Sequence, residues 1–312
     1  MAKRISKSSG RPIRVPGEPE AIVHVGDCRE VLSGLPAEAS FDLIFADPPF
    51  NWKRDYDRWG AGNAWDDARP EHEYLAFTYR WLDLCVARLA AHGALWVNIP
   101  DTWAAEIVVH LKAAGLQMVN WCVWHYRFGQ NTKTRFINSK VHVLYFMKDP
   151  SHPERRWNID EVLEVSDRRA IYGDRRTEEK RDGVEAGHRV PMDVWYGPLW
   201  GRVQGNNKER RHNHDNQLPE VYLGRVIAAC SNAGDSVLDP FVGSGTTGVV
   251  ARALGRRFVG IDYAKENARH AAERIEAGPM RSIEQLKQGL RGASSAIHAP
   301  RQANARRNGA AS

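Results

Sequence analysis

The chain has 312 residues, 42% of them hydrophobic, which suits one large α/β domain or two small ones. No apolar run comes close to the length of a membrane span, which is about 20 residues. Residues 1–18 lack the apolar stretch of a secretory signal. The four cysteines form no CxxC pair. We therefore expect a reduced, cytoplasmic chain without membrane contact, structural zinc or disulfides.

The net charge of +6 comes from the two ends of the chain. Residues 1–18 hold five basic side chains against one acidic side chain, and residues 279–312 hold six against one. Such segments are typical of solvated, disordered tails, and they also hold a polyanion loosely. We expect two basic disordered tails, and both roles stay open for them.

Short apolar runs alternate with helical patterns between these tails, which is typical of a sheet covered by helices on both faces. We expect an antiparallel edge pair among the strands, formed by residues 117–126 and 141–147. In chain order the pattern predicts strands over residues 21–25, 41–46, 93–99, 117–126, 141–147, 236–238 and 257–261, and helices over residues 73–91, 102–114, 219–230, 246–254 and 265–276.

The periodicity fails between Asp149 and Asn213, a stretch rich in charged residues and glycine that includes Trp157, Trp195 and Trp200. Long loops without secondary structure are uncommon in compact domains unless they are functional. The scattered aromatic residues indicate that this stretch packs against something. We expect an insert or small subdomain, and the alternative is a long disordered loop.

The strand over residues 41–46 ends at Asp47-Pro48-Pro49-Phe50. Two consecutive prolines cannot continue a strand ladder, because each lacks an N–H donor. The backbone therefore leaves the sheet carrying a carboxylate, proline carbonyls and an aromatic ring. This set suits a flat heterocycle with an exocyclic amine, as an enzyme that acts on a flipped DNA base requires. The alternative is a rigid strand-ending turn.

A second motif follows the strand over residues 236–238 and opens a helix. Its glycines allow a tight turn and close approach of the backbone to a ligand, and the helix start offers free N–H groups. Asp262 ends the next strand, where an acid holds a ribose diol or caps a helix. The candidate cofactor-binding residues of this motif are Asp239, Phe241, Gly243, Ser244, Gly245, Thr246 and Thr247.

These two motifs, their order and their strand contexts resemble the β-group of S-adenosylmethionine-dependent DNA amino-methyltransferases, which modify adenine N6 or cytosine N4. The resemblance covers residues 21–278 and implies a Rossmann-like, mostly parallel doubly wound sheet with a circularly permuted motif order. It implies a catalytic half over residues 19–148, an inserted target-recognition region over residues 149–213 and a cofactor-binding half over residues 214–278.

The resemblance also implies further contacts with S-adenosylmethionine. Asp27 and Cys28 match the family's element that contacts the adenine of the cofactor, with a simple turn as the alternative. The segment from His214 to Pro219 matches a family segment that binds the methionine end of the cofactor. Leu218 replaces its lysine, so we carry over only Gln217.

The implied reaction transfers a methyl group to an exocyclic amine held by Asp47 and Pro48, and it needs no metal. Family members with an acid at the first motif position usually modify adenine, and those with serine usually modify cytosine, so Asp47 favours adenine N6 in double-stranded DNA. The alternatives are an N4-cytosine enzyme, an RNA methyltransferase, a catalytically silent DNA-binding regulator and, last, a dinucleotide oxidoreductase. A homodimer and a cognate restriction nuclease are compatible with the resemblance.

DNA contacts are expected in two polar, basic stretches. Arginine and lysine there suit phosphates, and asparagine suits adenine edges. The alternative for the first stretch is a solvated hairpin loop. The candidate DNA-binding residues are Arg127, Asn131, Lys133, Arg135, Asn138 and Lys140 in the first stretch, and Lys208 and Arg210 in the second.

Overall fold

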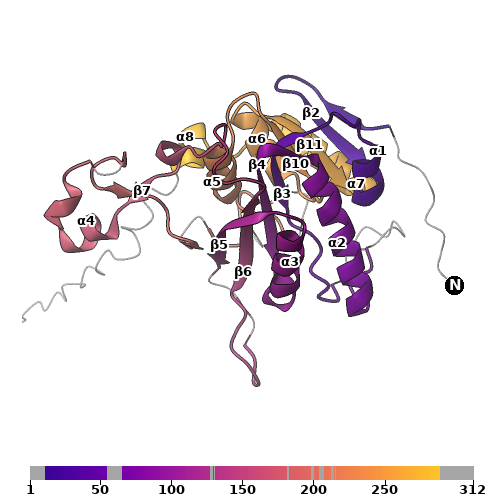
Figure 1. Cartoon of the computed structure of the whole chain (residues 1–312), viewed down its shortest axis with the longest axis horizontal. Helices are drawn as coiled ribbons and strands as arrows, with labels where there is room; N and C mark the ends of the chain where they lie inside the picture. Colours follow the sequence, from indigo (N-terminus) through magenta and orange to yellow (C-terminus); the bar gives the residue numbers. More distant parts are fainter. Residues whose placement is uncertain are drawn as a thin grey trace, which may run out of the picture.

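In the computed structural model, one nine-stranded sheet carries helices on both faces (Figure 1). The structure describes residues 11–54, 65–126, 129, 131–180, 183–197, 200–203, 207–211, 214 and 216–288. The strands are β1 (Ile13–Val15), β2 (Ala21–Val25), β3 (Phe41–Ala46), β4 (Leu89–Ile99), β5 (Gln117–His125), β6 (Lys140–Met147), β7 (Glu164–Val165), β8 (His188–Arg189), β9 (Val194–Trp195), β10 (Ser236–Asp239) and β11 (Arg257–Asp262). The helices are α1 (Cys28–Gly34), α2 (Glu71–Arg88), α3 (Asp101–Ala113), α4 (Asp167–Tyr172), α5 (Glu220–Cys230), α6 (Thr246–Ala253), α7 (Lys265–Ala277) and α8 (Ile283–Gln288).

The strand order in the large sheet is β1-β2-β11-β10-β3-β4-β6-β5-β9. The five strands from β2 to β4 run parallel, so their carboxyl ends meet at one edge of the sheet. Strand β6 runs antiparallel to both β4 and β5, which confirms the predicted antiparallel pair. The pair is not outermost, because the short β9 adds to β5.

Two buried clusters lie on the two faces of the sheet. Helices α1, α2 and α3 cover one face, and α5, α6, α7 and α8 cover the other. Strand β3 contributes to both clusters. Leu43 and Phe45 belong to the cluster under α5–α8, and Ile44 and Ala46 belong to the cluster under α1–α3. This period of two explains why a fully buried strand appears in the sequence as an unbroken apolar run.

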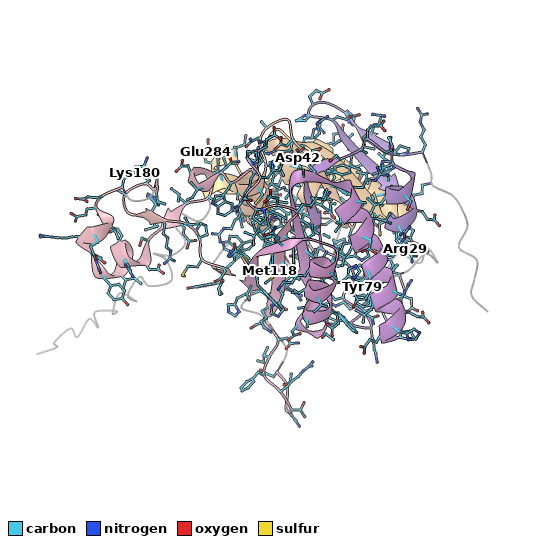
Figure 2. All side chains as sticks on the ribbon, in the orientation of Figure 1. Arg29, Asp42, Tyr79, Met118, Lys180 and Glu284 are labelled. Carbon is cyan, nitrogen blue, oxygen red and sulfur yellow. The ribbon has the colours of Figure 1, made fainter. Side chains whose placement is uncertain are left out.

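The stretch after β6 is an ordered insert in its described part, and Figure 1 shows its α4 and β7 projecting from the body. Lys180 lies in this outlying part in Figure 2, whereas Asp42 lies in the packed body. Strands β7 and β8 pair antiparallel within the insert. Glu164 ties it to the body through an ion pair of 3.0 Å with the buried Arg225 of α5.

The structure corrects the extent of both predicted tails. Strand β1 pairs antiparallel with β2 inside the expected tail of residues 1–18. Helix α8 lies inside the expected tail of residues 279–312 and packs its buried Leu286 against α5. Residues 1–10 and 289–312 lie outside the described residues. In the described part of the chain, no helix is long and apolar enough to span a membrane.

Candidate active site

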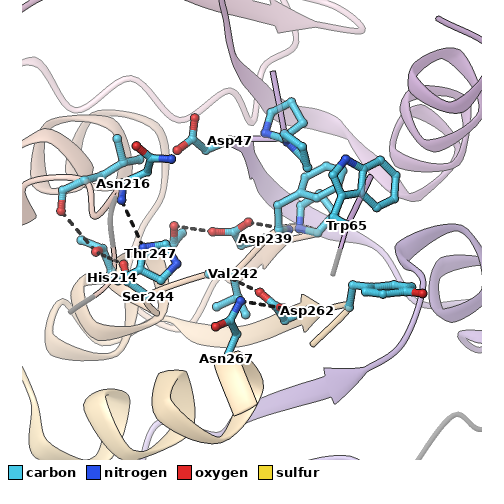
Figure 3. Close-up of a pocket in the computed structure, with 18 of the residues that line it drawn as sticks. Asp47, Trp65, His214, Asn216, Asp239, Val242, Ser244, Thr247, Asp262 and Asn267 are labelled. Carbon is cyan, nitrogen blue, oxygen red and sulfur yellow. Dashed lines mark hydrogen bonds between the residues drawn. The ribbon is translucent and has the colours of Figure 1, made fainter. Parts of the chain in front are cut away.

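One pocket at the carboxyl edge of the parallel strands brings the two sequence motifs together. Its walls come from the ends of β2, β3, β10 and β11, where ligands bind in open α/β sheets. Figure 3 shows the carboxylates of Asp47, Asp239 and Asp262 in this one pocket. Two segments that lie far apart along the chain therefore form one site because β3 and β10 are hydrogen-bonded neighbours.

Asp47 follows β3 and is only partly exposed. Its Oδ1 accepts a hydrogen bond of 3.2 Å from Nδ2 of Asn98, a fully buried residue of β4. Burial raises the pKa of Asp47 to about 6, while the Asn98 hydrogen bond and the charges of Arg202 and Arg54 oppose that rise. The carboxylate is therefore mostly ionised at neutral pH and able to accept hydrogen bonds from an amine.

The turn after Asp47 is held from behind by two aromatic side chains. The Tyr74 hydroxyl donates to the Pro49 carbonyl over 2.8 Å, and Nε1 of Trp103 donates to the Phe50 carbonyl over 3.0 Å. The Phe50 ring packs edge-on against Trp52, with ring centroids 5.0 Å apart. These contacts fix the backbone of the motif, and Pro48, Pro49 and Phe50 all line the pocket.

A sharp backbone turn follows the motif and is stabilised by Asp67. Asn51 and Lys53 both have left-handed φ values, 57° and 59°, which are costly for residues with a side chain. The Asp67 carboxylate accepts from the backbone N–H groups of Asn51, Trp52 and Arg54. These three hydrogen bonds offset the strain and keep the chain close to the pocket mouth.

The glycine turn is built around the buried Asp239 at the end of β10. Asp239 accepts from the Phe241 N–H over 2.9 Å and from the Thr247 hydroxyl over 2.5 Å. Burial raises its pKa to about 7, and the nearby carboxylates of Asp47 and Asp262 add to the rise. Asp239 therefore organises the turn, and its oxygens are already engaged within the protein.

Both glycines of the turn adopt conformations that other residues rarely tolerate. Gly243 has φ +47°, and Gly245 has φ +80°. A Cβ at Gly245 would lie 3.0 Å from Cα of Ala271 in α7, so this glycine permits close packing of α6 on α7. Gly245 does not line the pocket, whereas Gly243 and Ser244 do.

The hydrogen bonds of Asp262, at the end of β11, agree with its predicted role at a helix start, and the ribose contact stays a prediction. Its carboxylate accepts from the backbone N–H of Gly243 over 3.0 Å and of Ala264 over 2.8 Å, and from Asn267 over 3.3 Å. The last two contacts tie down the start of α7. The side chain also lines the pocket, and burial raises its pKa to about 6.

Asp27, Cys28 and Gln217, which were also predicted to contact the cofactor, line the pocket. The polar groups of Asp27 and Gln217 already bond within the protein, and the Cys28 thiol is neutral. Asp27 caps α1 and forms an ion pair of 2.6 Å with Arg29. Burial raises the pKa of the Cys28 thiol well above its ordinary value, which keeps it neutral. Gln217 uses both ends of its amide, accepting from the Arg211 N–H and donating to the Glu209 carbonyl.

The pocket lining contains 14 of the 15 residues predicted as catalytic or cofactor-binding, with Gly245 as the exception. It contains none of the described residues predicted to bind DNA. Lys140 pairs instead with Asp101 over 3.2 Å, and Arg210 donates to the His214 carbonyl over 3.4 Å. Arg127 lies outside the described residues. Exposed positions are taken by Asn131, Lys133, Arg135, Asn138 and Lys208.

The structure adds lining residues that sequence reasoning did not assign to the site. Arg54 and Asn216 connect the two halves of the chain across the pocket, with 2.5 Å between Nη1 and Oδ1. Tyr263 and Asn267 follow Asp262, which ends β11. Their sequence position next to a predicted site residue could have indicated that they line the pocket. Among the added residues are Arg54, Trp65, Phe77, Arg202, His214, Asn216, Tyr263 and Asn267.

The residues present fit a nucleoside ligand that carries a charged amino-acid end. One part of the pocket is aromatic, with the Trp65 ring tilted against Phe77 at a centroid distance of 4.5 Å and edge-on to Tyr263. Next to it lie the Asp262 carboxylate and the polar Asn267. The glycine turn and the start of α6 line the same pocket as Asp47 through Gly243, Ser244, Thr246 and Thr247.

A family model described as DNA methylase, of the N6/N4 type, matches residues 41–273. The chain belongs to this family of DNA methyltransferases. One relative is the type II methyltransferase M2.DpnII of Streptococcus pneumoniae, with 31% identity over 82% of this chain and 89% of that protein. Another is the DNA adenine methyltransferase YhdJ of Escherichia coli K12, with 32% identity over 88% of this chain and 89% of that protein.

Solved structures of DNA methyltransferases share the fold, which confirms the predicted architecture. The M1.HpyAVI complex with S-adenosylmethionine matches with a TM-score of 0.54 and 18% identity, over 81% of this chain and 98% of that one. The cytosine-N4-specific PvuII DNA methyltransferase matches with a TM-score of 0.59 and 16% identity, over 85% and 89%. Neighbours of this fold thus include a cytosine-specific enzyme, so the fold does not select the base.

Proposed function

We propose that this DNA methyltransferase transfers a methyl group from S-adenosylmethionine to the exocyclic N6 of an adenine flipped out of duplex DNA. The observation that carries the proposal is the position of Asp47. This carboxylate, not a serine, stands at the end of β3 in the pocket that holds the glycine turn. The adenine specificity named for the relative YhdJ agrees with it.

S-adenosylmethionine, when bound, supplies a methyl group on an electron-poor sulfur. The pocket residues that would hold it are the aromatic group of Trp65, Phe77 and Tyr263, the polar Asp262 and Asn267, and Gly243 and Ser244 of the glycine turn. The fit of these residues to a nucleoside with a charged end supports this cofactor.

Asp47 acts on the amine that receives the methyl group. The lone pair of an adenine N6 is delocalised into the ring, so the amine is a poor nucleophile. Hydrogen bonds from its N–H groups to the ionised Asp47 and to the Pro48 carbonyl favour a pyramidal nitrogen whose lone pair points away from the ring. The amine becomes acidic once methylated, and Asp47 or solvent then takes its proton. Positioning in a desolvated pocket supplies most of the acceleration.

Phe50 stacks on the flipped base in this proposal, a contact worth about 1–3 kcal/mol. The insert over residues 149–213 and the exposed basic residues of the β5–β6 connection would contact the duplex. The type II relatives support a partner nuclease in a restriction–modification pair. The N4-cytosine alternative keeps the same pocket and differs only in the base that it accepts.

Expression in a methylation-deficient host, followed by genome-wide mapping of modified bases, tests the proposal. The expected product is N6-methyladenine at one short sequence motif. Asp47→Ala should abolish the modification while leaving the thermal shift caused by S-adenosylmethionine intact. N4-methylcytosine at the mapped sites would overturn the adenine assignment, and methyl transfer to RNA but not to duplex DNA would overturn the substrate class.

A further inference from the structure

An almost fully exposed phenylalanine stands on the connection between β5 and β6. Phe136 is 97% exposed, more than any other large hydrophobic residue of the described chain, and Ile137 beside it is 45% exposed. The turn before them is held by Thr132, whose Oγ1 bonds to the carbonyl and the N–H of Arg135. The exposed ring therefore belongs to a locally ordered turn, where water contact with a large apolar side chain is unfavourable.

This connection rises from the wall of the active-site pocket. Trp124 of β5 and Val141 of β6 both line the pocket, and the Tyr126 N–H donates to the Ser139 carbonyl over 2.9 Å at the base of the connection. Figure 1 shows the connection projecting from the body beyond the ends of β5 and β6. A duplex that delivers a base into the pocket would therefore meet this projection next to the base.

The charge around Phe136 suits a polyanion such as nucleic acid and not a basic partner. Residues 131–140 contain Lys133, Arg135 and Lys140 and no acidic residue. Lys133 and Arg135 are exposed, so they are available to phosphates. Basic side chains that flank an apolar one are typical of proteins that insert a wedge between base pairs and unstack them.

We propose that Phe136 is a wedge that enters the base stack of duplex DNA beside the target base and stabilises its flipped state. The inference rests on the proposed function, because it needs a duplex substrate whose base is taken out of the stack. Phe136 acts on the duplex and not on the amine, so it is a positioning residue. Its loss should matter most where the target base is firmly stacked and paired.

Phe136→Ala tests the inference, with Val109→Ala as the control, since Val109 is 68% exposed on α3 and lies outside the pocket, the insert and the β5–β6 connection. Methyl transfer is measured on two oligonucleotide duplexes that carry the mapped site, one fully paired and one with a mismatch at the target base. A mismatch weakens stacking and pairing and so replaces the work of a wedge.

The expected result is a loss of about ten- to a hundredfold in kcat/KM for Phe136→Ala on the paired duplex, recovered largely on the mismatched duplex. Phe136→Trp should stay near wild type, and Val109→Ala should match wild type on both duplexes. An equal loss on both duplexes, or no loss, would overturn the wedge while the methyltransferase assignment stands. A wild-type protein that methylates neither duplex would overturn the proposed function and the wedge together.

Discussion

Asn98 Nδ2 lies 3.2 Å from Asp47 Oδ1 and donates a hydrogen bond to it. The amide is oriented by Tyr222, whose hydroxyl donates to Asn98 Oδ1 over 2.5 Å. Both residues are fully buried, Asn98 on β4 and Tyr222 on α5. A chain of two hydrogen bonds therefore runs from the core to the proposed catalytic carboxylate and favours its ionised form.

We predict that Asn98→Leu moves the acidic limb of the kcat/KM profile to higher pH. The Asn98 hydrogen bond lowers the pKa of Asp47, so its loss raises that pKa above about 6. A hydrogen bond to a charged group contributes about 1.5 kcal/mol, which corresponds to about one pH unit. Tyr222→Phe should move the limb in the same direction by less. An activity loss that is equal at every pH would show that Asn98 is merely structural.

Asp239→Asn should preserve the fold and change the pH dependence of stability. The folded protein holds the Asp239 proton up to about pH 7, whereas an unfolded chain releases it near its ordinary pKa of 3.8. The wild-type protein therefore loses stability as the pH rises from about 4 to about 7, and the loss is complete above that range. The asparagine does not titrate. The free energy of unfolding of the variant, measured in urea, should therefore rise relative to that of the wild type between about pH 5 and about pH 8. A constant difference between the two proteins would contradict this assignment.

Gly243→Ala and Gly245→Ala should separate cofactor binding from packing. Both positions have positive φ, so an alanine costs about 1–2 kcal/mol at each. At Gly245 the added methyl also meets the backbone of Ala271, so the loss in free energy of unfolding should be larger there. Gly243 lines the pocket, so its variant should weaken S-adenosylmethionine binding with the smaller loss of stability. Calorimetric titration measures the affinity for S-adenosylmethionine, and urea unfolding measures the loss of stability. A larger loss of stability for Gly243→Ala, or weaker cofactor binding for Gly245→Ala, would contradict the assigned roles.

Arg274→Met should destabilise the protein by about 3–5 kcal/mol in urea unfolding. Arg274 of α7 forms an ion pair of 3.2 Å with Glu220 of α5, and the two side chains are 3% and 0% exposed. Arg274 also donates to Thr246 over 2.7 Å at the start of α6. Its removal leaves a buried carboxylate without its cation. The double variant with Glu220→Gln should cost less than the two single changes together, and strict additivity would contradict a direct coupling.

The sequence located the buried strands because their apolar runs have few structural alternatives. The predicted bounds of β3 match the structure, and the turn it feeds lies where two prolines end the ladder. Strand β1 was missed since its three residues sit within a basic stretch and gain their partner only by pairing with β2. Helix α8 was missed for a related reason, since its buried Leu286 packs against α5.

The sequence predicted which residues line the pocket better than it predicted which hydrogen bonds their side chains make. The motif signals placed Gln217 and Thr247 at the pocket, but their hydrogen bonds go to the Glu209 carbonyl and to Asp239. These hydrogen bonds depend on how separate segments of the chain come together in the fold, which the motifs do not specify. The aromatic end of the pocket was equally hidden, because Trp65 and Phe77 lack a motif and meet only after folding.

The neighbouring positions of β3 and β10 have a consequence for the order of folding. Strand β3 can pair with β4 as soon as residues 41–99 have left the ribosome, but its other edge waits for residues 236–239. An apolar strand edge stays open through the synthesis of almost 140 intervening residues, which is a period of exposure to misassembly. The Asp47 carboxylate, which the proposal sets beside the methyl-accepting amine, thus exists early on a growing chain. The proposed donor side of the site is completed last, so we expect no methyl transfer from a nascent chain before its final third has folded.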